Sequence, residues 1–437
     1  MLQSYEGLDR PGGFDRVRLL SPLAHRDYRL LVTGMTVSLL GDGLFLIALV
    51  WKVYALSNAP SALATVGIAM TIPTIGCLLI GGAVSDRLNR RRIMLIADSA
   101  RAAALGGLAA LSVTGLLRLW QLLVIAAIYG AATAFFDPAS DALVPELIPA
   151  DVLAQANSLD QLIRPLALRL VGPALGGLLV SSIGTGATFG IDALSFLVSG
   201  ASLMAISRTP RTRRPSGGSV RREVTAGMRY VRGRPWLWAT LISAAIAYLV
   251  FLGPTEVLLP FMVKNQLHGG AGDLGLVFAA GGLSSLLCAM AIGQNGLPRR
   301  SILFMYLCWA AATFAVAGYG LVHALWGLMV ASAVFNGLET AGTIAWATAK
   351  QRHVPTALLG RVSSLDWLIS IGLLPVSYAL TGPVSSVLGV RTTLVAAGIV
   401  GGAVTLAALC IPGVLSLDSR EREEEPGDPL VPSVVAT

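Results

Sequence analysis

The sequence predicts an all-α integral membrane protein, with twelve transmembrane helices in two pseudo-symmetric six-helix bundles. Three observations support this: few charged residues, a series of apolar runs of membrane-spanning length, and one phrase that occurs twice. Of the 437 residues, 54% are hydrophobic and 13% are charged, and the mean hydropathy is +0.72. Soluble domains carry about 25% charged residues, so lipid is the expected solvent for most of this chain.

Twelve apolar runs are each long enough to cross a bilayer, which takes about 20 residues. Those in the first half of the chain lie near 29–53, 61–84, 93–114, 119–143, 156–181 and 186–206. Those in the second half lie near 236–262, 274–296, 301–321, 325–348, 364–388 and 392–415. The breaks near Gly115 and Gly184 are the least distinct, because the loops there are very short.

The runs divide the chain into five expected parts. These are a cytoplasmic segment at 1–28, bundles at 29–206 and 236–415, a basic cytoplasmic linker at 207–235, and a disordered cytoplasmic tail at 416–437. The second half of the linker carries Val224, Met228 and Val231 at helical spacing between arginines. This pattern is typical of an amphipathic helix on a membrane surface.

The basic residues are distributed unevenly between the two sides of the predicted spans. Of 32 Lys and Arg residues, 25 fall on the side of the amino terminus, four on the other side and three within spans. The positive-inside rule therefore places both termini in the cytoplasm, and the expected location is the cytoplasmic membrane of a bacterium. The net charge of +8 is explained by topology, so no nucleic-acid partner is expected.

A repeated phrase relates the two halves. "IPADVLAQANSLDQLI" at 148–163 recurs as "VPTALLGRVSSLDWLI" at 354–369, and in each half it opens the fifth span. Ser158 and Ser364 are candidate N-caps there, and the aspartates that follow favour a positive helix end. Two similar halves on a flexible linker predict a transporter for a small molecule, whose cavity opens alternately to either side of the bilayer. No nucleophile–base set or metal-ligand cluster suggests an enzyme.

Several motifs then resemble a known family. "GGAVSDRLNRRR" at 81–92 resembles the cytoplasmic loop signature of the major facilitator superfamily. "LLGDGLFLIAL", "VGPALGG" and "GRVSSLDWL" resemble its macrolide-efflux and enterobactin-exporter branch, and the resemblance runs from about Arg29 to Leu415. It implies proton-coupled efflux of a bulky amphipathic molecule, such as a macrolide or other drug. Siderophore export and lysophospholipid flipping on the same fold are the alternatives.

The resemblance implies a latch that closes the cytoplasmic side. The residues that fill the positions of the signature are Gly82, Asp86, Arg87, Arg90 and Arg91. Two residues of the third span, Asp98 and Arg101, are expected to belong to the same latch. Gly82 would let helices approach closely, and Asp86 would face the positive end of a helix from the other half. The arginines would pair with Asp98, with other carboxylates or with acidic lipid. Asn89 departs from the signature where a second glycine is expected, and a simple charged loop is the alternative.

The fifth span carries a motif that resembles an antiporter signature, with Gly172, Pro173, Gly176 and Gly177. A proline bend and a smooth glycine face would let helices slide or pack closely there. Leu168 replaces the glycine expected four residues earlier, so the direction of transport rests on the branch resemblance rather than on this motif.

Carboxylates inside predicted spans are the candidates for carrying protons. Asp42 leads, because it lies midway along the first span between two glycines, and Glu256 and Glu339 follow. Each charge costs roughly 2.5–3.5 kcal/mol at the bilayer centre, and removal of a carboxylate from water favours its protonated form. Structural ion pairs are the alternative for each. The proton gradient is the expected energy source, with no cofactor or metal, since the chain has no GxxxxGK phosphate loop.

Two arginines in the fifth span are less expected. Asp160 and Arg164 are spaced for a same-face ion pair. Arg169 lies on another face, and either pairs with Asp137 or Asp141 or attracts an anionic substrate into the cavity. Asp366, which repeats Asp160, is a further candidate for the cavity or for an ion pair. The protein is expected to work as a monomer.

Overall fold

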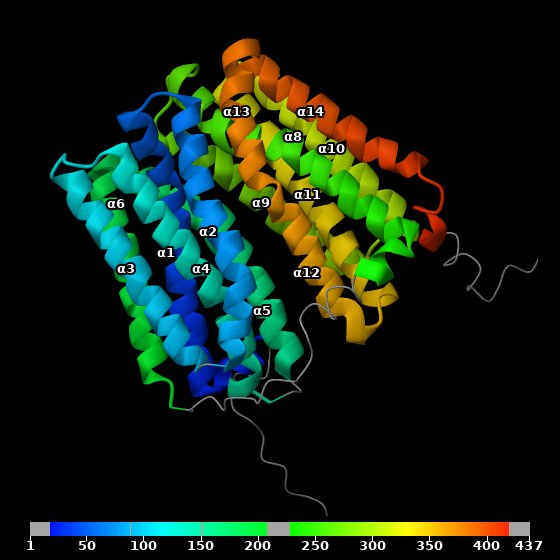
Figure 1. The fold of residues 1–437 in the computed structure, drawn as a ribbon, viewed down its shortest axis with the longest axis horizontal. Helices are drawn as coiled ribbons and strands as arrows, with labels where there is room; N and C mark the ends of the chain where they lie inside the picture. The colour runs from blue at the N-terminus through cyan, green and yellow to red at the C-terminus, as the bar shows by residue number, and fades with distance from the viewer. Residues whose placement is uncertain (1–17, 88, 150–151, 208–227, 419–437) are drawn as a thin grey trace, which may run out of the picture. The chain divides into compact units, whose positions relative to one another are not determined.

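The computed structural model describes residues 18–87, 89–149, 152–207 and 228–418. All regular structure in these ranges is helical (Figure 1). Most of the expected cytoplasmic segment, most of the linker and the tail from residue 419 lie outside them. The amphipathic helix expected in the linker can be followed only at its end, where residues 228–232 are helical.

The helices account for twelve crossings. Within the described ranges, eleven segments are long and apolar enough to span a membrane. One of them, Gln155–Ala205, has 51 residues, or about 75 Å at 1.5 Å per residue, which is more than twice the hydrocarbon thickness. Gly184 interrupts it with φ +83° and ψ 168°, a left-handed conformation that favours glycine. Counted as two crossings, this segment brings the total to twelve, in agreement with the sequence prediction.

The chain folds as two compact units. The first unit contains Met1–Leu49 and Ile72–Pro215, and the second contains Val50–Thr71 and Ser216–Thr437. The second unit therefore includes the end of one span and the start of the next, which the sequence assigns to the first bundle. Hydrogen bonds within the second unit explain this, because Tyr54 Oη donates to the carbonyl of Val257 at 2.6 Å.

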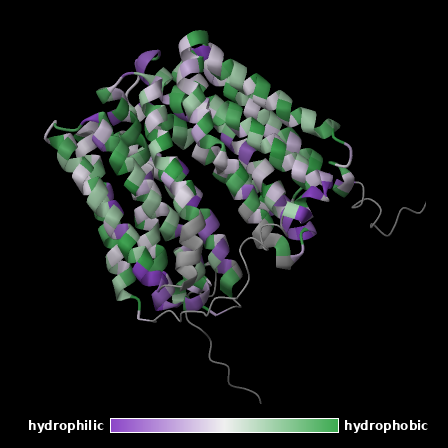
Figure 2. Ribbon diagram, viewed as in Figure 1, coloured by the Kyte–Doolittle hydropathy of each residue, from purple (hydrophilic) through white to green (hydrophobic). Residues whose placement is uncertain are grey.

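The first unit contains α1 (Arg26–Leu56) up to Leu49, the later part of α2 (Pro60–Arg87), α3 (Arg90–Val113), α4 (Leu119–Leu147), α5 (Leu153–Pro165) and α6 (Gly172–Ala205). A short 3-10 helix, η1 (Arg18–Ala24), precedes α1, and a π-helical segment, η3 (Leu166–Val171), joins α5 to α6. Buried residues of α1, α3 and α4, among them Met35, Met94 and Leu143, form its core. Figure 2 shows apolar residues along most of each helix, as expected where the outer surface faces lipid.

The second unit contains α8 (Pro235–Asn265), α9 (Ala271–Asn295), α10 (Ser301–Leu321), α11 (Leu325–His353), α12 (Thr356–Gly372), α13 (Leu374–Leu388) and α14 (Val390–Ala407), followed by the 3-10 turn η4 (Ala408–Cys410). Trp236, Tyr306 and Trp346 lie in its core. Small residues allow close packing, since a Cβ at Gly398 would overlap the backbone of Ala317. The predicted eleventh span is two helices, and α13 begins with Pro375 in its first turn.

Two local predictions are corrected. Ser158 and Ser364 are not N-caps, because α5 begins at Leu153 and α12 at Thr356, so both serines lie inside helices. The tail does not begin at residue 416, because Leu417 and Asp418 are ordered and buried. Asp418 accepts hydrogen bonds from the backbone N–H groups of Ile302 at 3.0 Å and Leu303 at 2.9 Å, which caps the start of α10.

Candidate functional site

Asp42 lies on α1 at a point where two helices approach closely. An added Cβ at Gly43 would come within 2.7 Å of the Cα of Gly172 on α6. An added Cβ at Gly41 would overlap the side chains of Asp192 and Ser195 on the same helix. The glycines on either side of Asp42 therefore let α6 pack against α1 beside this carboxylate.

Tyr129 of α4 donates a short hydrogen bond to Oδ1 of Asp42. Its ring stacks on Phe45, with centroids 4.7 Å apart, and meets the edge of Phe196 at 6.3 Å. These aromatic contacts fix the ring, so the hydroxyl is held toward Asp42. The carboxylate therefore has a fixed donor within a mostly apolar setting.

Asp192 is a residue that the sequence hypothesis missed. Its side chain lies on α6 and is fully buried. Ser195 Oγ donates to the Asp192 carbonyl at 2.7 Å and approaches its Oδ1 at 3.1 Å, whereas Oδ2 has no hydrogen-bond partner among the described residues. The rule that singled out Asp42, a carboxylate inside a span, applies equally to Asp192 in the apolar run 186–206.

Arg101 and Asp98 form a buried ion pair inside the first unit. Arg101 Nη2 lies 2.5 Å from Asp98 Oδ1, and both side chains are at most 3% exposed. Ser199 Oγ donates to the other carboxylate oxygen of Asp98 at 2.7 Å. The guanidinium carbon lies 4.4 Å from the ring centre of Phe136 and 4.3 Å from that of Phe196, which is cation–π geometry.

This pairing corrects one part of the latch hypothesis. The sequence suggested that loop arginines pair with Asp98, but its partners are Arg101 and a serine within the same unit. A carboxylate this deeply buried requires a charged partner beside it, and Arg101 follows it by one helical turn. We refer to Asp42, Asp98, Arg101, Tyr129 and Asp192 as the acidic network.

Electrostatic interactions connect the members of the acidic network. Arg101 interacts with Asp42, Asp98 and also Asp137, and Asp42 interacts with Asp192. One guanidinium thus faces several carboxylates in a region of low dielectric constant. Since uncompensated charges are costly there, the charge state of each member depends on the charges of the others.

The loop arginines fasten the start of α3 to the ends of other helices. Arg90 pairs with Glu146 and donates to the carbonyl of Ala142 at 2.8 Å, both near the end of α4. Arg91 donates to the carbonyls of Met204 at 2.5 Å and Ile206 at 3.0 Å, at the end of α6. Cations at helix C-termini satisfy free carbonyls. These arginines therefore hold the first unit together at this end.

The rest of the predicted latch lies at the end of α2. Gly82 is inside this helix, and Asp86 and Arg87 are in its last turn. The side chains of Asp86 and Arg87 lie outside the part of the chain that the structure describes. Their role as a latch stays a prediction.

The glycine motif of the fifth span packs directly on α1. Gly172 approaches Gly43, and an added Cβ at Gly176 would lie 3.1 Å from the Cα of Leu44. Pro173 is in the first turn of α6, directly after the π-helical segment η3, and Gly177 is buried. The motif therefore places α6 against α1 at the level of Asp42. π-Helical segments such as η3, which interrupt an α-helix, are frequent at functional sites.

Arg164 is at the centre of a second group of carboxylates. Its Nε lies 2.9 Å from Asp160 Oδ1, one helical turn away, and its Nη1 lies 3.9 Å from Asp137 on α4. Asp137, one of the two partners expected for Arg169, therefore lies beside Arg164. Arg169 itself is exposed on η3. A cavity of about 190 Å³ lies beside this group.

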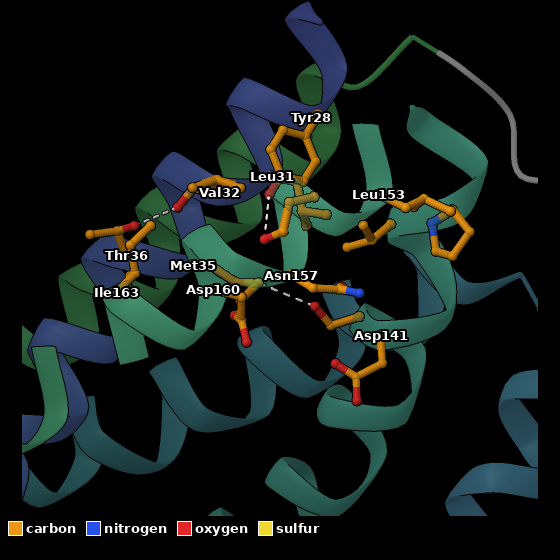
Figure 3. Close-up of a pocket in the computed structure, with 14 residues that line it drawn as sticks. Tyr28, Leu31, Val32, Met35, Thr36, Asp141, Leu153, Asn157, Asp160 and Ile163 are labelled. Atoms are coloured by element: carbon orange, nitrogen blue, oxygen red, sulfur yellow. Dashed lines mark hydrogen bonds between the residues drawn. The ribbon is translucent and has the colours of Figure 1, made fainter. Parts of the chain in front are cut away.

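The cavity is lined by residues of α1, α4 and α5 of the first unit (Figure 3). Asp141, Asn157 and Asp160 contribute its polar lining, and Leu31 and Leu153 lie on its apolar side. Tyr28, also in the wall, donates from its hydroxyl to the carbonyl of Ala156 at 3.3 Å. Its carboxylate and amide side chains come from the repeated phrase and from α4, and α1 contributes the hydroxyls of Tyr28 and Thr36.

The candidates in the second unit have local partners. Glu256 of α8 is partly buried and interacts electrostatically with Tyr319 and Tyr378. Glu339 of α11 accepts a hydrogen bond from Thr343 at 3.0 Å.

Asp366 of α12 likewise has partners within the second unit. It pairs with Lys350 and accepts from Trp346 Nε1 at 2.9 Å. Asp366 therefore takes part in an ion pair, one of the two roles weighed for it.

Twelve helical crossings with ionisable groups enclosed among them are typical of a membrane transporter. The match to a family model and the relatives described below place the chain among the transporters of the major facilitator superfamily, which are not enzymes. Within that class, the chain belongs to the transmembrane secretion effector family, whose model matches residues 18–436. Residues of both units are thus included in the match.

Two of the curated relatives are named as efflux proteins, and a third is named only as a transporter. The multidrug efflux pump Tap of Mycolicibacterium fortuitum is 26% identical over 396 residues, 86% of this chain and 94% of Tap. The enterobactin exporter EntS of Escherichia coli O1:K1 is 26% identical over 350 residues, 78% of this chain and 81% of EntS. The match to the transporter YfiS of Bacillus subtilis spans 63% of this chain and 65% of YfiS.

A solved structure shares the fold. A bacterial homologue of the iron transporter ferroportin, in an inward-facing state, superposes with a TM-score of 0.66. The match covers 88% of this chain and 98% of that one at 16% identity. At this identity the likeness supports the fold alone.

Proposed function

We propose that this protein exports a bulky amphipathic small molecule, such as a macrolide or another drug, in exchange for protons. Transport crosses the bacterial cytoplasmic membrane by alternating access of the two predicted bundles, 29–206 and 236–415. The protein works as a monomer with both termini in the cytoplasm, and the proton gradient is its energy source. The family match and the efflux activities named for Tap and EntS support this direction of transport.

The observation that carries the proposal is the setting of Asp42. A carboxylate inside a span, with a fixed tyrosine donor and a nearby arginine, can exist in both protonated and ionised forms. A group with no function would be costly to keep at this position. Proton exchange explains why Asp42 has a tyrosine donor and a nearby arginine within a mostly apolar setting.

The energy available matches this role. Each proton that moves inward releases about 2.3 kcal/mol per 100 mV of membrane potential. Since a tenfold gradient corresponds to about 1.4 kcal/mol, one proton sustains roughly a fifty-fold gradient of a neutral substrate. Exchange of one proton per substrate molecule is therefore sufficient for detoxification.

Siderophore export is the second candidate. The relative EntS is named as an enterobactin exporter, and the exposed Arg169 on η3 offers a positive charge to an anionic molecule. A neutral or cationic drug would not need this arginine. Arg169→Gln therefore separates the two candidates, since it reduces export of enterobactin but leaves export of erythromycin unchanged.

Everted membrane vesicles test the main proposal. With wild-type protein, we expect accumulation of radiolabelled erythromycin when the vesicles are energised, and collapse of that accumulation on addition of an uncoupler. Asp42→Asn should reduce accumulation to the level of vesicles without the protein. The matched control is Asp273→Asn, where the amide oxygen still accepts from the N–H of Gly270 at the start of α9. Unchanged energised uptake in Asp42→Asn would refute Asp42 as the proton carrier.

A further inference from the structure

Asp192 is a fully buried carboxylate that the proton exchange described so far does not use. Its Oδ2 has no hydrogen-bond partner among the described residues, and its Oδ1 shares one serine hydroxyl with the backbone. An ionised carboxylate in this position would be one of the least solvated charges in the protein. A neutral carboxylic acid, by contrast, needs few partners.

The position of Asp192 brings it next to the proposed proton carrier. Its Oδ1 fills the space that a side chain at position 41 would occupy, so it lies against the backbone of α1 beside Asp42. The two carboxyl groups also interact electrostatically. Gly41 is thus explained by the carboxyl group of Asp192, which only a residue without a Cβ can accommodate.

Charged and titratable groups face Asp192 from three other helices. These groups are Asp42 from α1, Arg101 from α3 and Tyr129 from α4, and Asp98 and Asp137 act in turn on Asp42 and Arg101. Arg101 is held by its ion pair with Asp98, and Tyr129 donates to Asp42. Arg101 already compensates the negative charge of other carboxylates, so it cannot fully compensate an ionised Asp192. A proton on Asp192 removes that uncompensated negative charge.

We propose that Asp192 is a second proton-binding residue of the transport cycle, which shares an exchanged proton with Asp42. This inference rests on the proposed proton-coupled efflux. When Asp42 is ionised, Asp192 holds the proton. When the proton returns to Asp42, the O–H bond of Asp192 breaks as an O–H bond forms on Asp42. One negative charge thereby moves from Asp42 to Asp192, and no change of oxidation state occurs.

Infrared difference spectroscopy of the purified protein tests the shared proton without any substrate. We expect a carboxylic-acid C=O band in the wild type that is absent from Asp192→Asn and that changes its pH dependence in Asp42→Asn. Ser195→Ala should shift the band, because the hydroxyl near Oδ1 is lost. This second variant keeps the test valid if Asp192→Asn does not fold. The proposal is overturned if Asp192→Asn keeps every carboxylic-acid band of the wild type, or if the band does not shift in Ser195→Ala.

Transport measurements in proteoliposomes test the role in coupling, with radiolabelled erythromycin as the probe. Asp192→Asn should lose proton-driven accumulation by at least about tenfold, whereas Asp273→Asn should keep it within about twofold. The control is Asp273→Asn. Full coupling in Asp192→Asn overturns the inference and leaves the proposed function intact. If erythromycin accumulation by the wild type does not depend on the proton gradient, the proposed function is overturned. The infrared band then still decides whether the two carboxyl groups share a proton.

Discussion

Tyr129 donates a hydrogen bond to Asp42, from α4 to α1, across residues 87 positions apart in the chain. The two residues belong to the same compact unit, so their contact does not depend on how the units are placed. Asp42 carries the proposed exchange, and Tyr129 is a positioning residue that holds its carboxylate. Variants of Tyr129, Arg101 and Gly43 test the packing and the charges around Asp42.

Tyr129→Phe removes the hydrogen bond and keeps the aromatic packing on Phe45. We expect energised erythromycin uptake to fall by about tenfold, because a hydrogen bond to a charged group contributes about 1.5–3 kcal/mol. The pH at which uptake is half-maximal should also change, which a merely structural role would not produce. Uptake in everted vesicles over a range of pH measures both effects.

The control for this variant is Tyr306→Phe in the second unit. Tyr306 is also a buried tyrosine whose hydroxyl has a side-chain partner, Thr240 at 2.7 Å. Its loss should lower stability without changing the pH profile. Equal pH profiles for wild type and Tyr129→Phe would contradict the positioning role.

Arg101 is expected to be the residue on which the stability of the first unit depends most. Arg101→Met leaves Asp98 as an unpaired buried carboxylate, which should lower the free energy of unfolding by about 3–5 kcal/mol. Arg101→Lys keeps the charge but loses the planar contact with Phe136 and Phe196, with an expected loss of about 1–2 kcal/mol. Thermal unfolding in detergent measures the order of these variants.

The double variant Asp98→Asn with Arg101→Met separates charge from packing. It removes both charges, so most of the stability lost in Arg101→Met should return. A double variant as unstable as Arg101→Met would show that the guanidinium acts through its packing and not through its ion pair.

Gly43→Ala should disrupt the approach of α6 to α1. The new Cβ would lie 2.7 Å from Gly172 Cα and 2.8 Å from the carbonyl of Ala167, and backbone atoms cannot rotate away. We expect a loss of about 1–3 kcal/mol in stability and a fall in erythromycin uptake. The matched control is Gly106→Ala on α3, where nothing lies within 4 Å of the added Cβ. That change should be neutral or stabilising by about 0.5–1 kcal/mol, so equal effects at both glycines would contradict this packing.

Much of the fold follows from one-dimensional patterns. The predicted runs at 119–143 and 301–321 coincide closely with α4 and α10, because a bilayer requires apolar segments of one length with all backbone groups satisfied internally. The i, i+4 spacing predicted the pair of Asp160 and Arg164, which the structure shows at 2.9 Å. Helix interruptions were predicted less well, because the prolines beside η3 and at the start of α13 indicate a bend but not whether the helix breaks there.

The amino-acid sequence by itself determined the class of the protein and its spans, and it singled out Asp42 as a candidate, because each of these depends on the energy of placing one residue or one segment in lipid. Only the tertiary structure decided which groups share the interior with Asp42. The contacts of Arg101 with Phe136 and Phe196, the donor role of Tyr129 and the approach of Asp192 to Gly41 all join residues of different helices. Spacing along the chain carries no information about such contacts, since the register and rotation of one helix against another are set by the side chains that interlock between them.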